Sequence, residues 1–77
     1  MPDNDPNYRG LYAAYQRLLA LAVIDEIGPC RRVARELTFD AREGIIGMAL
    51  YDHEMNPHDD AVEWVLEICK EENRANT

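Results

Sequence analysis

An uninterrupted apolar run is the feature that most constrains how this chain can fold. Seven consecutive residues, Leu18 to Ile24, carry no polar side chain, and they lie inside a segment with the spacing of an amphipathic helix. At about 100° per residue these positions turn almost twice around a helix, so they cannot all face one core. A chain of 77 residues has little material to cover a helix on every side. We therefore expect part of the run to contact a second copy of the chain or another protein.

The first helix is predicted over residues 6–27. Asp5 followed by Pro6 is typical of a helix start, and Gly28 followed by Pro29 is typical of a helix end. Two adjacent apolar rows run along this segment, Leu11, Tyr15, Leu18 and Ala22 in one and Tyr12, Leu19, Val23 and Ile27 in the other. We assign Leu18 and Ala22 to the core. The residues expected to mediate self-association are Tyr12, Leu19, Leu21 and Ile24.

Two further helices are predicted in the middle of the chain. A short one covers residues 29–37, and the next begins at Asp40, with Glu43 three residues later as in a capping box. Residues 44–51 contain Gly44 and Gly47 together with β-branched side chains, so they fit either a helix or a buried strand. We prefer the helix, because a lone strand would have no partner in this chain.

A last helix is predicted from Asn56-Pro57, a second start signal, to about Asn73, followed by a frayed tail at residues 74–77. Its inward-facing residues are Ala61, Val62, Val65, Leu66 and Cys69, beside Trp64 and Ile68. The whole chain, residues 1–77 with a loose lead-in at 1–6, is thus predicted to be one all-α domain. We expect a small three- or four-helix bundle that self-associates through the first helix.

The charge balance indicates what kind of partner the chain meets. It has 15 acids against 8 bases, a formal net charge of -7. Such a chain is repelled by nucleic acid and by anionic membranes, so we expect a protein partner with a basic surface and no direct nucleic-acid or membrane binding. The acidic start is unlike a signal peptide and the apolar run is too short to span a bilayer, so we expect a cytoplasmic protein.

The sequence carries little that predicts catalysis or metal binding. Residues 52–60 contain His53 and His58 among several acids, but the spacing matches no common ligand pattern and Pro57 interrupts it. There is no serine, and we expect Cys30 and Cys69 to be reduced thiols. We therefore predict no metal, no cofactor and no enzymatic activity.

The only basic cluster, Arg31, Arg32 and Arg35, suggests contact with an anion or an acidic partner, or pairing with acids of the same chain. Residues 33–50 are loosely similar to a helix-turn-helix DNA-binding unit. Its recognition helix would offer Asp40, Arg42 and Glu43, two acids and one base, which departs from what phosphate binding needs. A small transcriptional regulator is therefore the alternative function.

The main functional prediction rests on acids near the end of the chain. Glu63, Glu67 and Glu71 repeat every four residues, a spacing that does not favour the helix itself. The predicted partner-binding face consists of Asp59, Asp60, Glu63, Glu67 and Glu71. An ordinary solvated helix face is the competing interpretation. We predict a protein-binding inhibitor or adaptor; by analogy of size and charge alone, this class includes phage or mobile-element proteins directed at basic, nucleic-acid-binding bacterial proteins.

Overall fold

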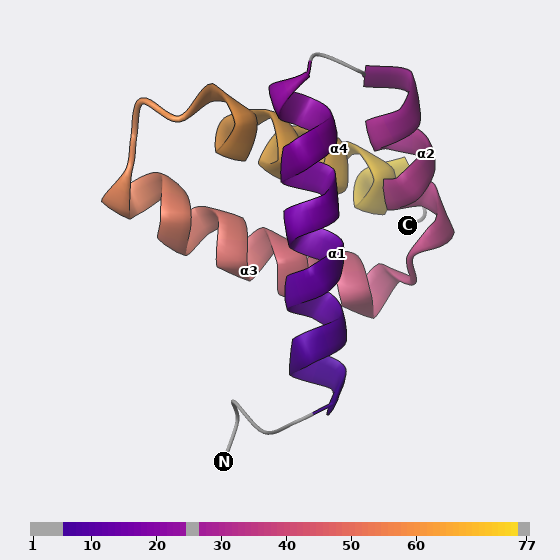
Figure 1. Ribbon diagram of the computed structural model, residues 1–77. Coiled ribbons are helices and arrows are strands. Elements are labelled where there is room, and N and C mark those ends of the chain that lie inside the picture. The colour runs from indigo at the N-terminus through magenta and orange to yellow at the C-terminus, as the bar shows by residue number, and fades with distance from the viewer. Residues whose placement is uncertain (1–5, 25–26, 76–77) are drawn as a thin grey trace.

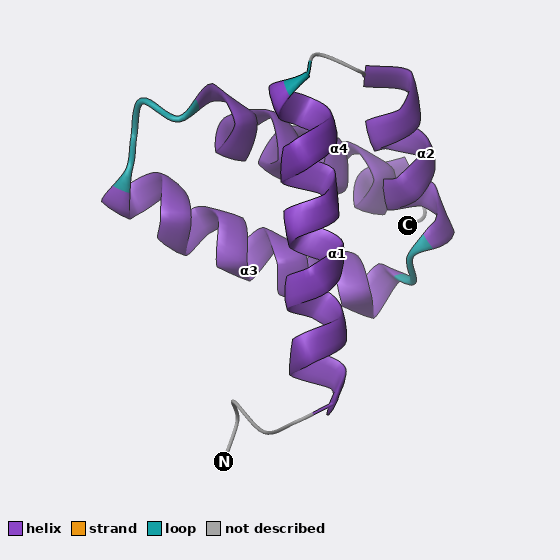
Figure 2. Ribbon diagram, viewed as in Figure 1, coloured by secondary structure: helices purple, strands orange, loops and turns teal. Residues whose placement is uncertain are grey.

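A computed structural model describes residues 6–24 and 27–75, and within these ranges the chain is helical with no strand (Figures 1 and 2). The four helices are α1 (Pro6–Val23), α2 (Ile27–Glu36), α3 (Phe39–Met55) and α4 (Asp60–Ala75). The all-α prediction is confirmed, and residues 44–51 are helical. Residues 1–5 of the predicted lead-in, with the Asp5 cap, and residues 76–77 of the predicted tail lie outside the described residues.

The four helices pack around one core. The helices α3 and α4 form an antiparallel hairpin, α1 crosses this hairpin, and α2 lies beside the C-terminal part of α4 (Figure 1). The buried apolar side chains are Tyr15, Leu18, Ala22, Cys30, Ala34, Ile45, Ala49, Val62, Val65, Leu66, Ile68 and Cys69. The predicted core roles of Leu18 and Ala22 and of the inward face of the last helix are thereby confirmed. In the described part of the chain, no helix is long and apolar enough to cross a membrane.

The helix α1 passes close to α3 at Gly44, where a side chain would meet Leu11. A Cβ atom at this position would lie 2.8 Å from the Leu11 Cδ1 atom, closer than such atoms approach in folded proteins. Because glycine has no Cβ, α1 comes close to α3 here without displacing Leu11. The helical penalty that glycine carries is therefore offset by a close helix–helix contact.

The predicted end of the first helix is wrong. The helix α1 ends at Val23, with Ile24 in a turn, and Gly28 and Pro29 lie in the first turn of α2 instead of stopping α1. Proline is compatible with a first turn because the N–H that it lacks would have no partner inside the helix. The earlier end lets α2 fold back, and the buried Cys30 thiol donates a weak hydrogen bond to the Leu18 carbonyl of α1 at 3.7 Å.

Two predicted caps are also wrong. The N-cap of α3 is Thr38, whose hydroxyl accepts from the Ala41 N–H at 3.0 Å, so the helix starts before Asp40. Asn56 ends α3 instead of starting α4, and the carboxylate of Asp59 caps α4. Each site offers several capping residues in succession, and the side-chain oxygen that accepts from a backbone N–H identifies the one that is used. The last helix also extends two residues past its predicted end at residue 73, to residue 75.

Candidate partner-binding surfaces

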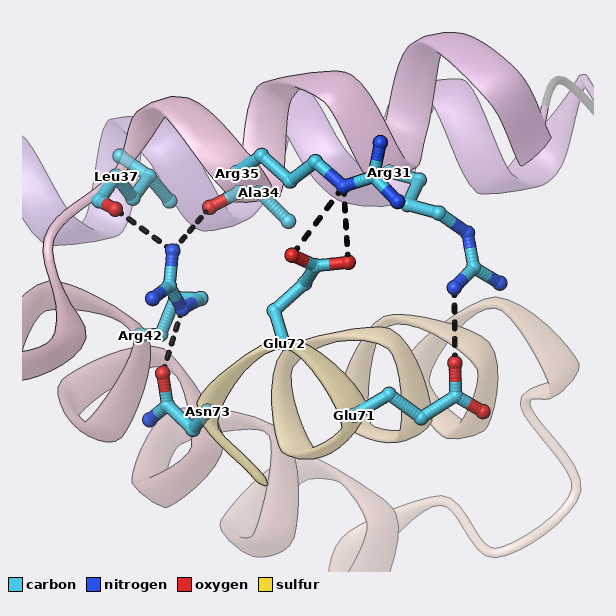
Figure 3. A network of polar contacts seen from close by, with 8 residues as sticks. All are labelled: Arg31, Ala34, Arg35, Leu37, Arg42, Glu71, Glu72 and Asn73. Atoms are coloured by element: carbon cyan, nitrogen blue, oxygen red, sulfur yellow. Dashed lines mark hydrogen bonds and ion pairs between the residues drawn. The ribbon is translucent and has the colours of Figure 1, made fainter. Parts of the chain in front are cut away.

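Two ion pairs join α2 to α4 at the surface (Figure 3). The Arg31 guanidinium donates to a Glu71 carboxylate oxygen at 3.0 Å, and Arg35 Nε lies 3.2 Å from a Glu72 oxygen. Both arginines belong to the predicted basic cluster, whose third member, Arg32, is exposed. Surface pairs of this kind contribute about 0–1 kcal/mol. Arg31 and Arg35 therefore already have carboxylate partners within the chain, which weakens the cluster as a site for an external anion.

Arg42 is buried where α2, α3 and α4 meet (Figure 3). One terminal nitrogen donates to the carbonyls of Ala34 and Leu37 at 2.8 and 2.7 Å, and Nε donates to the side-chain oxygen of Asn73. The carbonyls at the end of α2 carry the negative end of its dipole, which favours a cation there. The helix-turn-helix alternative gains no support from this arrangement, because Arg42 faces the core and does not reach a phosphate.

The structural role of Arg42 was not predicted from the sequence, although one signal for it exists. Arg42 precedes Ile45 and Ala49 by three and seven residues, which is the spacing of one helix face, and all three side chains are buried. Its partner Asn73 is buried as well, and the Asn73 amide also donates to the Phe39 carbonyl at 3.3 Å. A charged residue in an apolar row is thus a signal of a buried polar contact. The sequence does not identify the partner in that contact.

The five acids predicted as a partner-binding face have different roles in the structure. The Asp59 carboxylate accepts from the backbone N–H groups of Ala61 and Val62 at 3.1 and 3.4 Å, so it caps α4. Glu71 is paired with Arg31. These two carboxylates stabilise the fold itself, which makes them less available to a partner.

The other three acids, Asp60, Glu63 and Glu67, are exposed and lie together beside Trp64. These four residues line a shallow hollow of about 300 Å³ on α4. Trp64 is half-buried, packed against the core on one side. A tryptophan surrounded by carboxylates presents an aromatic surface in a negative potential, which is favourable for a lysine or arginine side chain. We call these four residues the acidic hollow.

The apolar run of the first helix is divided among three environments. Leu18 and Ala22 are buried, whereas Leu19 and Leu21 are half-buried against the core. Val23, and the predicted self-association residues Ile24 and Tyr12, are exposed, with 71%, 61% and 50% of their surface accessible. The core of one chain therefore covers only part of the apolar run. This agrees with the prediction that seven consecutive apolar residues cannot all face one core.

A second hollow lies in the corner where α1 crosses α3. It has a volume of about 410 Å³ and is lined by Tyr12, Tyr15, Gly47, Met48, Tyr51 and Asp52. The buried Tyr15 hydroxyl donates to the Asp52 carboxylate at 2.8 Å. Burial, together with this carboxylate, raises the pKa of Tyr15 above its ordinary value, so the phenol stays protonated. We call these six residues the aromatic hollow.

A groove of about 660 Å³ runs between the outer faces of α3 and α4. It is lined by Phe39, Glu43, Ile46, Glu67, Lys70, Asn73 and Arg74. Its floor is partly apolar, but the rim carries two acids and two bases. This groove therefore favours neither a basic nor an acidic partner, whereas the acidic hollow favours a basic one.

The thiols and histidines show no arrangement typical of catalysis. Burial raises the pKa of Cys69 to about 11 and also raises that of Cys30, so both thiols are protonated at neutral pH. His53 is half-buried near the end of α3, and His58 is exposed in the following turn. Within the described ranges, no group of three or more His, Cys, Asp or Glu side chains is placed to hold a metal ion.

Comparisons with known proteins give no family assignment. No protein-family model matches the chain, and neither a curated protein nor a solved structure matches it significantly.

Proposed function

We propose that this chain is a non-catalytic protein-binding module, an inhibitor or adaptor whose acidic hollow docks on a basic protein surface. The supporting observation is that Asp60, Glu63 and Glu67 remain exposed around Trp64, while Asp59 and Glu71 are engaged in the fold. A basic, nucleic-acid-binding bacterial protein is the class of partner that this surface fits best, because such a protein presents clustered lysines and arginines to a phosphate backbone.

The charge and the aromatic ring have separate roles in this proposal. The net charge of -7 attracts a basic partner from a distance and speeds encounter. Trp64 supplies a large, partly fixed surface at the centre of the acids, and tryptophan is among the residues that most often dominate binding energy. A cationic side chain over the indole would be held by cation–π attraction and by the adjacent carboxylates.

Self-association through the first helix is the second part of the proposal. In the segment predicted as the first helix, Ile24 is exposed just after the end of α1, Tyr12 is half-exposed, and Leu19 and Leu21 are half-buried. Covering several such side chains in each of two copies would hold a dimer at micromolar concentration. A dimer would also display two acidic hollows and so strengthen binding to a partner with repeated basic patches.

The test is charge reversal with a matched control. The variant Glu63→Lys with Glu67→Lys alters the acidic hollow, whereas Glu36→Lys with Glu54→Lys alters exposed acids elsewhere. Each substitution adds two positive charges, so both double variants change the net charge from -7 to -3. We expect wild type and the control to capture the same basic protein from a bacterial lysate, and the hollow variant to lose it.

The association rate of wild type with the captured protein should fall as salt rises, because screening shortens the reach of the charges. If the hollow variant binds as tightly as the control, the acidic hollow is ordinary solvated surface and the proposal is wrong. Far-ultraviolet circular dichroism of both variants should match wild type, since all four substituted positions are exposed.

A further inference from the structure

The glycine at position 47 has no role that a single copy of the chain explains. At Gly44, one turn earlier in α3, an added Cβ would meet the side chain of Leu11. At Gly47, as at Gly10 and Gly28, an added Cβ would have no atom within 4 Å, so the space above it is open. Glycine in the interior of a helix destabilises it relative to alanine, and at Gly47 no contact within the chain offsets that loss. The open backbone suits a surface that another molecule approaches closely.

Gly47 is part of the floor of the aromatic hollow, and aromatic rings flank it on two helices. Tyr12 of α1 is half-exposed, and Tyr51, one turn after Gly47 in α3, is 66% exposed. Further along α3, Leu50 and Met55 are also exposed. The aromatic hollow and the exposed ring of Tyr51 therefore lie together on the part of α3 beyond its crossing with α1, whose course Figure 1 shows.

We infer that a second copy of this chain covers this face, with Tyr51 of each copy packed over Gly47 of the other about a two-fold axis. A two-fold contact joins the same patch on both copies, so the patch must be complementary to itself. The cavity at Gly47 and the projecting ring of Tyr51 meet that requirement, because they are four residues apart on one side of α3. The inference rests on the proposed self-association and moves its centre from the end of α1 to Tyr12 and α3.

Charge favours a second copy over a basic partner at this face. Two copies that each carry -7 repel one another, so they can associate only through surfaces with few exposed charges. The aromatic hollow contains one acid, Asp52, whose carboxylate already accepts from the buried Tyr15 hydroxyl, and one exposed acid, Glu54, lies beside it three residues after Tyr51. A basic protein would instead be drawn to the acidic hollow on α4.

The available area indicates a modest affinity. A tyrosine buries about 150–250 Å² when fully covered, and Tyr12 and Tyr51 still have half or more of their surface to bury. With Met55, one turn after Tyr51 on the same side of α3, they form the centre of an interface smaller than the roughly 800 Å² per partner of a standard complex. We therefore expect a dimer that forms at micromolar concentrations and dissociates on dilution.

Light scattering and sedimentation equilibrium test the inference with two matched variants. Wild type at about 100 µM should have twice the 8.8 kDa chain mass. Tyr51→Lys should be a monomer at that concentration, whereas Phe39→Lys, an equal charge change at an exposed aromatic residue at the other end of α3, should remain a dimer. Both variants lower the net negative charge, so a loss of association cannot come from added repulsion.

Gly47→Ala separates the interface from simple stability. The added methyl group meets open space in one chain, so the melting temperature of the diluted protein should rise by about 2–5 °C. The same methyl group would meet Tyr51 of the other copy, so the dimer dissociation constant should increase by roughly tenfold or more. An effect on folding alone would not move these two measurements in opposite directions.

The possible contrary results are distinct. If a third variant, Ile24→Lys, abolishes the dimer and Tyr51→Lys leaves it intact, the contact lies at the end of α1 and this inference is wrong while the proposed self-association stands. If wild type is a monomer throughout, both are wrong. Capture of a basic partner through the acidic hollow would be unaffected by either result.

Discussion

At the scale of single residues, the guanidinium of Arg42 has the most unusual environment. It is buried, and its hydrogen bonds reported above are accepted by two carbonyls and one amide oxygen, all neutral. A buried cation is retained only when its donors are satisfied, since leaving them unpaired costs several kcal/mol. Arg42 therefore connects the end of α2 to the end of α4 through one side chain (Figure 3).

Replacing Arg42 with methionine should lower the free energy of unfolding by about 2–4 kcal/mol, because the Ala34 and Leu37 carbonyls and the Asn73 amide lose their partner. Urea denaturation followed by circular dichroism measures this loss. The control Arg32→Met, at an exposed position, should change stability by less than about 0.5 kcal/mol. Equal stabilities for the two variants would show that the buried hydrogen bonds contribute nothing net.

At the scale of helices, the boundaries depend on capping residues that compete with near neighbours. Thr38 and Asp40 are both suitable N-caps, and only Thr38 accepts a hydrogen bond from a backbone N–H at the start of α3. Asp40 lies in the first turn, where its charge interacts with the helix dipole. The two residues should therefore contribute unequally to the stability of α3.

Thr38→Ala should destabilise the protein by about 1 kcal/mol through loss of the cap, whereas Asp40→Ala should cost roughly 0.3–0.5 kcal/mol through weaker interaction with the dipole. Thermal denaturation at low and high salt distinguishes the two, because only the Asp40 contribution is screened. A larger loss from Asp40→Ala than from Thr38→Ala would mean that Asp40 caps the helix in solution.

The apolar rows of the helices could be predicted, but not every helix end. Tyr15, Leu18 and Ala22 repeat at helical spacing, and all three are buried, because periodicity reports directly on which face meets the core. The helix ends are harder to predict than the buried faces. Gly28 and Pro29, for example, fit the end of one helix and the first turn of the next equally well. Only the packing of α2 against the rest of the chain decides between these two uses.

At the scale of the whole molecule, two buried thiols and a buried phenol have raised pKa values, and these lower the stability of the fold at alkaline pH. Burial raises the pKa of Cys69 from 9.0 to about 11, and raises those of Cys30 and Tyr15 as well. In the unfolded chain these groups release protons at lower pH than in the folded one. The stability that these protonated groups contribute is therefore present below about pH 9 and is lost as the pH rises through the pKa of the folded state.

The free energy of unfolding should fall by about 2 kcal/mol from Cys69 alone between pH 9 and pH 11. Urea denaturation at a series of pH values measures the slope. Cys69→Ala should be less stable at every pH but should show a shallower slope, because the thiol that titrates is absent. A slope unchanged by this substitution would assign the alkaline sensitivity to other groups.

Contacts between residues that are far apart in the sequence could not be predicted from the sequence. The sequence shows the cluster of Arg31, Arg32 and Arg35 and allows pairing within the chain, but it does not identify Glu71 and Glu72 as the partners. Likewise the acids of the last helix looked equivalent in sequence. Their division into cap, ion pair and exposed hollow follows from which helix lies beside each one, and local spacing does not encode that.

The contact between Arg42 and Asn73 also sets a condition on protein synthesis. The two residues are 31 positions apart, so a ribosome must add Asn73 before the Nε of Arg42 can bond to its native side-chain acceptor. Until then, closing the core would bury a cation with one of its donors unsatisfied, which is unfavourable. The nascent chain therefore cannot complete this core one helix at a time as it is made. It is expected to fold in one step once the last turn of α4 has been synthesised.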